Sequence, residues 1–134
     1  HLKKESMNKQ EIKQSEIQEN KINSPKINSF VAINYISCQD YYKPRFEELF
    51  KSRIKAIDKM PGFIFMNVLK PVNNQGDYLI VSYWNNEDAF KDWTKSANFI
   101  EGHKRGFEDI KLAKENNQEP PMKSDFKTYN VMSA

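Results

Sequence analysis

The chain has 134 residues, a length that favours one domain with a single core. Its one cysteine, Cys38, and two histidines, His1 and His103, exclude an intramolecular disulfide, a cysteine-rich metal centre and a multi-histidine metal site. The 21 basic and 18 acidic residues leave a net charge of +3. No apolar segment is long enough for a transmembrane helix and no apolar signal sequence is visible, so we expect no membrane insertion and a cytoplasmic location.

Residues 1–28 differ in composition from the rest of the chain. They contain six Lys, four Glu and no aromatic residue, and their isoleucines recur every five positions. Such a spacing rotates about 140° per step on a helix and forms no apolar stripe. We therefore predict a polar, disordered tail over 1–28 and a folded domain over 29–134. The domain carries 15 basic and 14 acidic residues, a balance of +1 that predicts no nucleic-acid partner.

The first predicted element is a strand over 30–36, because the segment FVAINYI is apolar and rich in β-forming residues. A turn over 37–40 follows it. Pro44 suits the first turn of a helix, where its missing N–H costs little. Apolar residues then recur at three- and four-residue spacing over 46–57, which predicts one helix face ended by Pro61-Gly62.

Strands are next predicted over 63–69 and 78–84, separated by the turn cluster 71–76. Asn85 or Asn86 can cap the helix that follows, because Glu87 and Asp88 lie favourably in its first turn.

A further helical segment over 99–114, with Gly106 as a candidate break, leads to a polar loop over 115–121 and a last strand over 126–132. The order β-α-β-β-α-β predicts an α+β fold of the ferredoxin-like type. RNA-recognition modules share this order, but the segment 77–84 lacks their basic-glycine start.

Three residues stand out as chemical candidates. Trp93 precedes His103 by ten residues, and His103 is the only histidine outside the tail. Taken alone, Trp93 reads as a core residue and His103 as an exposed or internally bonded helical histidine. Cys38 has no histidine near it in sequence and reads as an unreactive thiol.

With Asn34 on the first predicted strand, Trp93 and His103 resemble the IsdG-type heme-degrading monooxygenases of the antibiotic biosynthesis monooxygenase superfamily. Those proteins place an Asn on the first strand, a Trp on the second main helix and a His ten residues after that Trp. The surrounding pattern agrees at Phe50, Arg53, Gly62-Phe63 and Phe90-x-x-Trp93-x-x-Ser96.

The resemblance implies a homodimer in which two sheets pack face to face as a dimeric α+β barrel. Heme would be both substrate and cofactor, O2 and an external electron donor would open the porphyrin, and iron would be released. By the same resemblance His103 is the proximal iron ligand, Asn34 the distal hydrogen-bond donor and Trp93 the wedge that distorts the porphyrin. Phe50 would line the pocket, and Arg53 either meets a propionate or is a solvent-exposed helix charge.

Two alternatives stay open from the sequence. The first is a cofactor-independent quinol or polyketide monooxygenase of the same superfamily, in which His103 binds no iron. The second is a non-catalytic protein that binds heme without degrading it. Addition of hemin and then of reductant separates the three possibilities, because only a heme-degrading enzyme shows both a Soret band and its bleaching.

Overall fold

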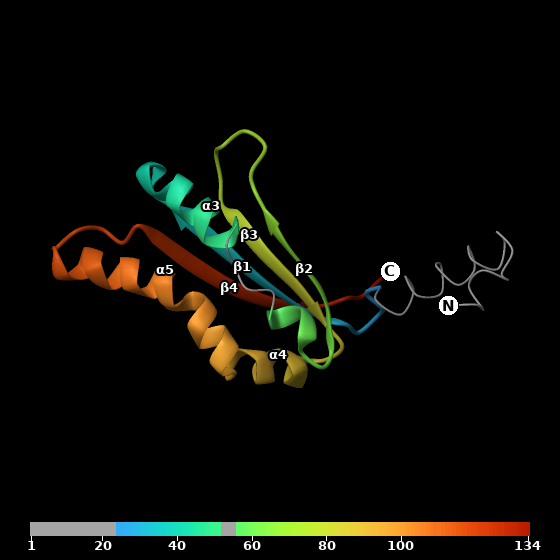
Figure 1. The fold of residues 1–134 in the computed structure, drawn as a ribbon. Helices are drawn as coiled ribbons and strands as arrows, with labels where there is room; N and C mark the ends of the chain where they lie inside the picture. Colours follow the sequence, from blue (N-terminus) through green and yellow to red (C-terminus); the bar gives the residue numbers. More distant parts are fainter. Residues whose placement is uncertain (1–23, 52–55) are drawn as a thin grey trace, which may run out of the picture.

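The structure, a computed structural model, describes residues 24–51 and 56–134, and it forms one α+β domain (Figure 1). The predicted tail lies mostly outside the described residues, as does Arg53. The elements in chain order are β1 (Phe30–Cys38), a 3-10 turn (Asp40–Tyr42), α3 (Lys43–Lys51), a second 3-10 turn (Ala56–Lys59), β2 (Phe63–Leu69), β3 (Tyr78–Trp84), α4 (Glu87–Thr94), α5 (Ala97–Glu115) and β4 (Met122–Asn130). The four strands pair antiparallel in the order β2-β3-β1-β4, which confirms the ferredoxin-like prediction.

The strand predictions hold in the middle of the sheet and fail at its edge. β2 and β3 have the predicted bounds, and β1 runs two residues further than expected, to Cys38. β4 begins at Met122, four residues before the predicted start. The reason is its place at the sheet edge, where both faces of most of the strand are exposed, so that Lys123 and Asp125 are tolerated and the sequence resembles a loop.

The helices also differ from the prediction. α3 is described as far as Lys51, and Ala56–Lys59, where the end of one helix face was expected, is a 3-10 turn. α5 runs unbroken through Gly106. A Cβ at Gly106 would lie 3.2 Å from Met122 Cε, so glycine lets the helix approach β4 closely, and tertiary packing offsets its low helix propensity.

Both helices that precede β4 begin at side-chain caps. The Asn86 side chain accepts a hydrogen bond of 2.9 Å from the Ala89 amide at the start of α4, as predicted. The Ser96 hydroxyl accepts one of 3.1 Å from the Phe99 amide at the start of α5. These caps fix the corner between α4 and α5, which lie in sequence on either side of Ser96.

The core lies between one face of the sheet and the helices, in two groups of residues. The Trp84 cluster consists of Phe30, Ala32, Ile57, Trp84 and Trp93. The Phe46 cluster consists of Ile36, Tyr42, Phe46 and Tyr78. Because side chains alternate along β1, the even-numbered residues face this core and Asn34 falls between the two clusters.

The opposite face of the sheet carries the odd-numbered residues of β1. There Phe65 stacks on Tyr83 with ring centroids 4.5 Å apart, and Lys127 Nζ lies 5.5 Å from the centroid of the Tyr35 ring. Within the described part of the chain, α3 and α4 pack on the core face, and α5 approaches it at Met122. This second face is called the open face below.

Candidate functional site

Asn34 holds the one buried side-chain polar atom that lacks a hydrogen-bond partner among the described residues. Its Oδ1 is buried, although the residue as a whole is only partly covered. Its cross-strand neighbours are Ile80 on β3 and Phe126 on β4, which share its face of the sheet. A buried polar atom in apolar surroundings costs about 1–3 kcal/mol when it stays unpaired. The amide is therefore poorly explained as a structural residue, and a ligand atom is a suitable partner for it.

His103 projects from α5 as an exposed side chain held in one orientation. Its Nδ1 lies 2.7 Å from the carbonyl oxygen of Phe99, one turn earlier in the helix. A carbonyl oxygen only accepts, so Nδ1 carries the proton and Nε2 of the neutral ring keeps its lone pair. The ring packs between Phe99 and Phe107, with centroids 4.0 and 5.9 Å away. This arrangement leaves Nε2 as an oriented ligand atom.

Trp93 lies in the core, as its sequence pattern alone predicts. It is 9% exposed and belongs to the Trp84 cluster. Its ring meets Phe99 edge to face at 5.6 Å, and Phe99 in turn packs on His103. The structure thus joins Trp93 and His103 through one shared aromatic neighbour.

The two remaining predicted pocket residues, Phe50 and Arg53, have no described contact with Asn34, Trp93 or His103. Phe50 is partly buried, packs on the Phe46 cluster and meets Phe46 at 5.0 Å between centroids. Arg53 lies outside the described residues, so its role stays a prediction.

Exposed apolar side chains near these residues were missed by the sequence reasoning. Ile100 and Phe107 are more than half exposed and lie at positions −3 and +4 from His103, on the same side of α5. Phe126 is also half exposed, lies beside Asn34 and stacks on Phe90 of α4 at 5.6 Å. The helical spacing of 100, 103 and 107 was the signal that could have identified this surface, because it places the histidine within an apolar stripe.

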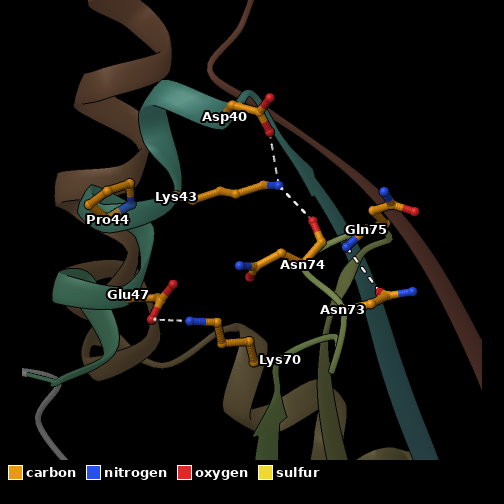
Figure 2. Close-up of a pocket in the computed structure, with 8 residues that line it drawn as sticks. All are labelled: Asp40, Lys43, Pro44, Glu47, Lys70, Asn73, Asn74 and Gln75. Atoms are coloured by element: carbon orange, nitrogen blue, oxygen red, sulfur yellow. Dashed lines mark hydrogen bonds and ion pairs between the residues drawn. The ribbon is translucent and has the colours of Figure 1, made fainter.

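A polar hollow of about 510 Å³ lies elsewhere, between α3 and the turn that joins β2 to β3 (Figure 2). Asn34, Phe50, Trp93 and His103 do not line it. Its charged groups satisfy one another, since Lys43 Nζ lies 2.9 Å from an Asp40 oxygen and Lys70 Nζ lies 3.2 Å from Glu47 Oε1. This hollow is therefore not the candidate site.

The metal chemistry available to the described residues is narrow. They contain no group of three or more His, Cys, Asp or Glu side chains that could hold a metal ion. Burial raises the pKa of the Cys38 thiol to about 11, which keeps it protonated at neutral pH. A single histidine suits heme, because the nitrogen atoms of the porphyrin already coordinate the iron and the protein has to supply only one ligand. None of the helices described is both long and apolar enough to span a bilayer.

The fold and these residues define a small α+β domain with one exposed, oriented histidine on its longest helix, α5. The family described as antibiotic biosynthesis monooxygenase matches residues 29–105, more than half of the chain. The chain belongs to this family.

The sequence is also similar to individual proteins of known activity. A protein of Mycobacterium tuberculosis named heme oxygenase (mycobilin-producing) is 33% identical over 63 residues, 47% of this chain and 60% of that protein. A heme-degrading monooxygenase of Halalkalibacterium halodurans is 32% identical over 56 residues, 40% of this chain and 48% of that protein. The matches thus span about half of the length of these relatives.

Solved structures show the fold. The heme degrader MhuD from Mycobacterium tuberculosis, with two hemes in its active site, has a TM-score of 0.55 at 23% identity over 78% of this chain and 97% of that chain. SnoaB, a cofactor-independent oxygenase from Streptomyces nogalater, has a TM-score of 0.58 at 15% identity over 80% of this chain and 96% of that one. Fold similarity alone therefore does not separate heme chemistry from cofactor-independent chemistry.

Proposed function

We propose that this protein is a heme-degrading monooxygenase that binds heme through His103 and opens the porphyrin with O2 and external electrons, releasing iron. The observation that carries the proposal is the orientation of His103. The hydrogen bond of 2.7 Å from Nδ1 to the Phe99 carbonyl oxygen leaves Nε2 with a free lone pair on an exposed ring. A carbonyl acceptor on the second nitrogen is the usual support of a metal-bound histidine.

The residues around His103 fit a heme in their chemistry. Heme is a large, flat and mostly apolar molecule, which suits a site of apolar and aromatic side chains with few polar groups. Ile100 and Phe107 offer such a surface on α5, and Phe126 offers one on β4. No protein donor holds Asn34 Oδ1 among the described residues, so the amide can turn about its terminal bond and direct Nδ2 toward a ligand acceptor.

Each residue has a separate task in this proposal. Bound heme supplies the iron at which O2 is activated. His103 would hold the iron, and Asn34 would offer a hydrogen-bond donor from its amide nitrogen. Trp93, held by the Trp84 cluster, would supply the steric bulk against the macrocycle. Phe50 would line the pocket, and Arg53 would pair with a propionate.

The proposal includes further partners. Ring opening consumes electrons that no residue of this chain supplies, so an external electron donor is required, and a cytoplasmic location suits such a donor. The open face carries Phe65, Tyr83 and the partly exposed Tyr129 among its residues, and we propose that a second copy of the chain packs on it to form a homodimer.

A hemin titration of the purified protein tests the function. We expect a Soret band with saturation near one hemin per chain, and loss of that band under air when ascorbate or a reductase is added. His103→Ala should lose axial ligation, and added imidazole should restore the spectrum, which separates loss of the ligand from misfolding. Asn34→Ala should keep hemin binding and lose turnover.

The outcomes separate the alternatives. No Soret band with the wild-type protein would favour a cofactor-independent oxygenase, the activity named for SnoaB, whose fold is as similar as that of the heme degrader. A Soret band that survives reductant and air would indicate a heme-binding protein without turnover. An unchanged spectrum in His103→Ala would overturn the assignment of the iron ligand.

A further inference from the structure

α5 carries His103 but is held to the rest of the domain at few places. It packs chiefly on α3, α4 and the 3-10 turn Ala56–Lys59, and Ala113 is its one fully buried residue. In Figure 1, α5 extends from the corner with α4 alongside β4. The position of His103 therefore depends on a small number of contacts beyond that corner, among them a hydrogen bond of 3.2 Å from Arg105 Nη2 to the Leu49 carbonyl oxygen.

A hydrogen-bonded cluster beyond His103 joins α5 to α3 and to the 3-10 turn Asp40–Tyr42 that precedes α3. The Tyr42 hydroxyl donates to Asp109 Oδ2 at 2.6 Å, and Arg45 Nε donates to the same oxygen at 3.1 Å. Tyr42 is 5% exposed, and its burial together with the Asp109 carboxylate raises its pKa, so the hydroxyl stays a donor. We call Tyr42, Arg45 and Asp109 the α5 clasp. Charge-assisted bonds of this length are among the stronger hydrogen bonds in proteins.

A shift of α5 at the clasp would also move His103. His103 lies six residues after the start of α5 at Ala97, and Asp109 lies six residues beyond His103. If α5 swings about its capped start, a displacement of about 2 Å at Asp109 moves His103 by about 1 Å, because helix rise is uniform. A misplacement of about 1 Å is enough to lower a catalytic rate by about a hundredfold.

We propose that Tyr42 and Asp109 are positioning residues that fix α5 against α3 and the 3-10 turn before it, and thereby set the place of His103 relative to the sheet. The inference rests on the proposed function, because it concerns the residue that would hold the iron. Neither residue is adjacent to His103 in sequence, and among the described residues neither forms a hydrogen bond with its side chain. Their effect on heme binding would therefore pass through the helix.

The chain contains a matched control for this cluster. The Tyr78 hydroxyl donates to Glu47 Oε2 at 2.7 Å, and Lys70 Nζ lies 3.2 Å from Glu47 Oε1 (Figure 2 shows Glu47 and Lys70). Tyr78 is 2% exposed, so the buried tyrosine, carboxylate and cation repeat the chemistry of the α5 clasp. This second cluster joins α3 to the sheet and does not include α5.

The experiment compares Tyr42→Phe and Asp109→Asn with Tyr78→Phe and Glu47→Gln in the full-length protein. We expect the clasp variants to raise the hemin Kd about tenfold or more, and to shift the Soret maximum of the bound hemin. The control variants should change the hemin Kd by less than about twofold, because their cluster is independent of α5. All four should lower the melting temperature by similar amounts.

Amide hydrogen exchange of the ligand-free protein gives a second readout. Exchange over 100–106 should accelerate in Tyr42→Phe and not in Tyr78→Phe. The inference would be overturned if the wild-type protein binds hemin and the clasp and control variants then show equal spectra, equal Kd values and equal exchange rates. Failure of the wild-type protein to bind hemin would instead overturn the proposed function, and faster exchange confined to the clasp variants would still support the role of the clasp in fixing α5.

Discussion

Replacement of Asn34 by leucine should stabilise the ligand-free protein and, under the proposed function, slow its turnover of heme. The amide lies between two apolar clusters, and its Oδ1 is buried without a partner among the described residues. An unpaired buried polar atom costs about 1–3 kcal/mol, and leucine has the same branched arrangement of side-chain heavy atoms as asparagine without the polar groups. Asn34→Leu should therefore raise the free energy of unfolding by about 1–3 kcal/mol, or the melting temperature by roughly 3–10 °C.

Ser82→Ala is the matched control, because Ser82 is a buried polar residue on the same sheet face. Its hydroxyl accepts a hydrogen bond of 2.9 Å from Trp84 Nε1, and Trp84 is fully buried. Removal of the hydroxyl leaves that N–H unpaired and should lower the free energy of unfolding by about 1–3 kcal/mol. The two substitutions should thus act in opposite directions in urea denaturation at fixed pH.

Turnover completes the test of Asn34. Without the amide donor on the distal side, hemin should still bind through His103, and ring opening should slow by about tenfold or more. Asn34→Leu would refute this reasoning if it destabilised the protein as Ser82→Ala does, since the amide would then have a structural role. Degradation of heme at the wild-type rate would refute the distal role separately.

Four further predictions concern two glycines and the thiol. Gly62→Ala should lower the free energy of unfolding by roughly 2–4 kcal/mol in urea denaturation, because Gly62 has φ +80° and a Cβ there would lie 2.6 Å from Ala89 Cβ. Adding Ala89→Gly to this variant should recover part of the loss. A double variant without any recovery would contradict the steric explanation. Gly102→Ala should raise the same free energy by about 0.5–1 kcal/mol, because a Cβ there meets nothing within 4 Å on an exposed helix face, and a melting temperature below that of the wild type would oppose this. Burial raises the pKa of Cys38 to about 11, so iodoacetamide at pH 8.5 should label the native protein more slowly than the urea-unfolded one. Because the raised pKa belongs to the folded state, the thiol favours folding below its unfolded pKa, and this contribution should fade as pH rises from about 9 to about 11; equal pH dependence in Cys38→Ala would contradict it.

The central strands were predictable from the sequence and the edge strand was not. β2 and β3 are bounded by turn residues, so pattern and structure agree on Phe63–Leu69 and Tyr78–Trp84. β4 lies at the sheet edge, where most of its side chains are exposed on both faces, and its first half carries no alternating apolar signal. The break predicted at Gly106 is absent for a different reason. The low helix propensity of glycine is offset there by the close approach of α5 to Met122, a contact between residues distant in sequence.

The candidate site was predictable only in part. Resemblance to a family selected Asn34, Trp93 and His103, but it could not reveal that Asn34 Oδ1 lacks a partner or that Phe99 orients the imidazole. Both facts depend on side-chain placement. Phe126 escaped notice because it is the partner of Asn34 across β1 and β4, a register that the sequence does not encode locally.

The core face of the sheet is built in two ways. At the Trp84 cluster the polar atoms are paired and the rings pack edge to face, as in a domain core selected for stability. On α5 the side chains of Ile100 and Phe107 beside His103 stay exposed, and on the sheet Asn34 Oδ1 has no partner among the described residues. A chain that only had to fold would gain stability by filling this region. Under the proposed function, a bound heme covers these apolar side chains and partners the amide, so the same features that weaken the ligand-free domain become binding interactions.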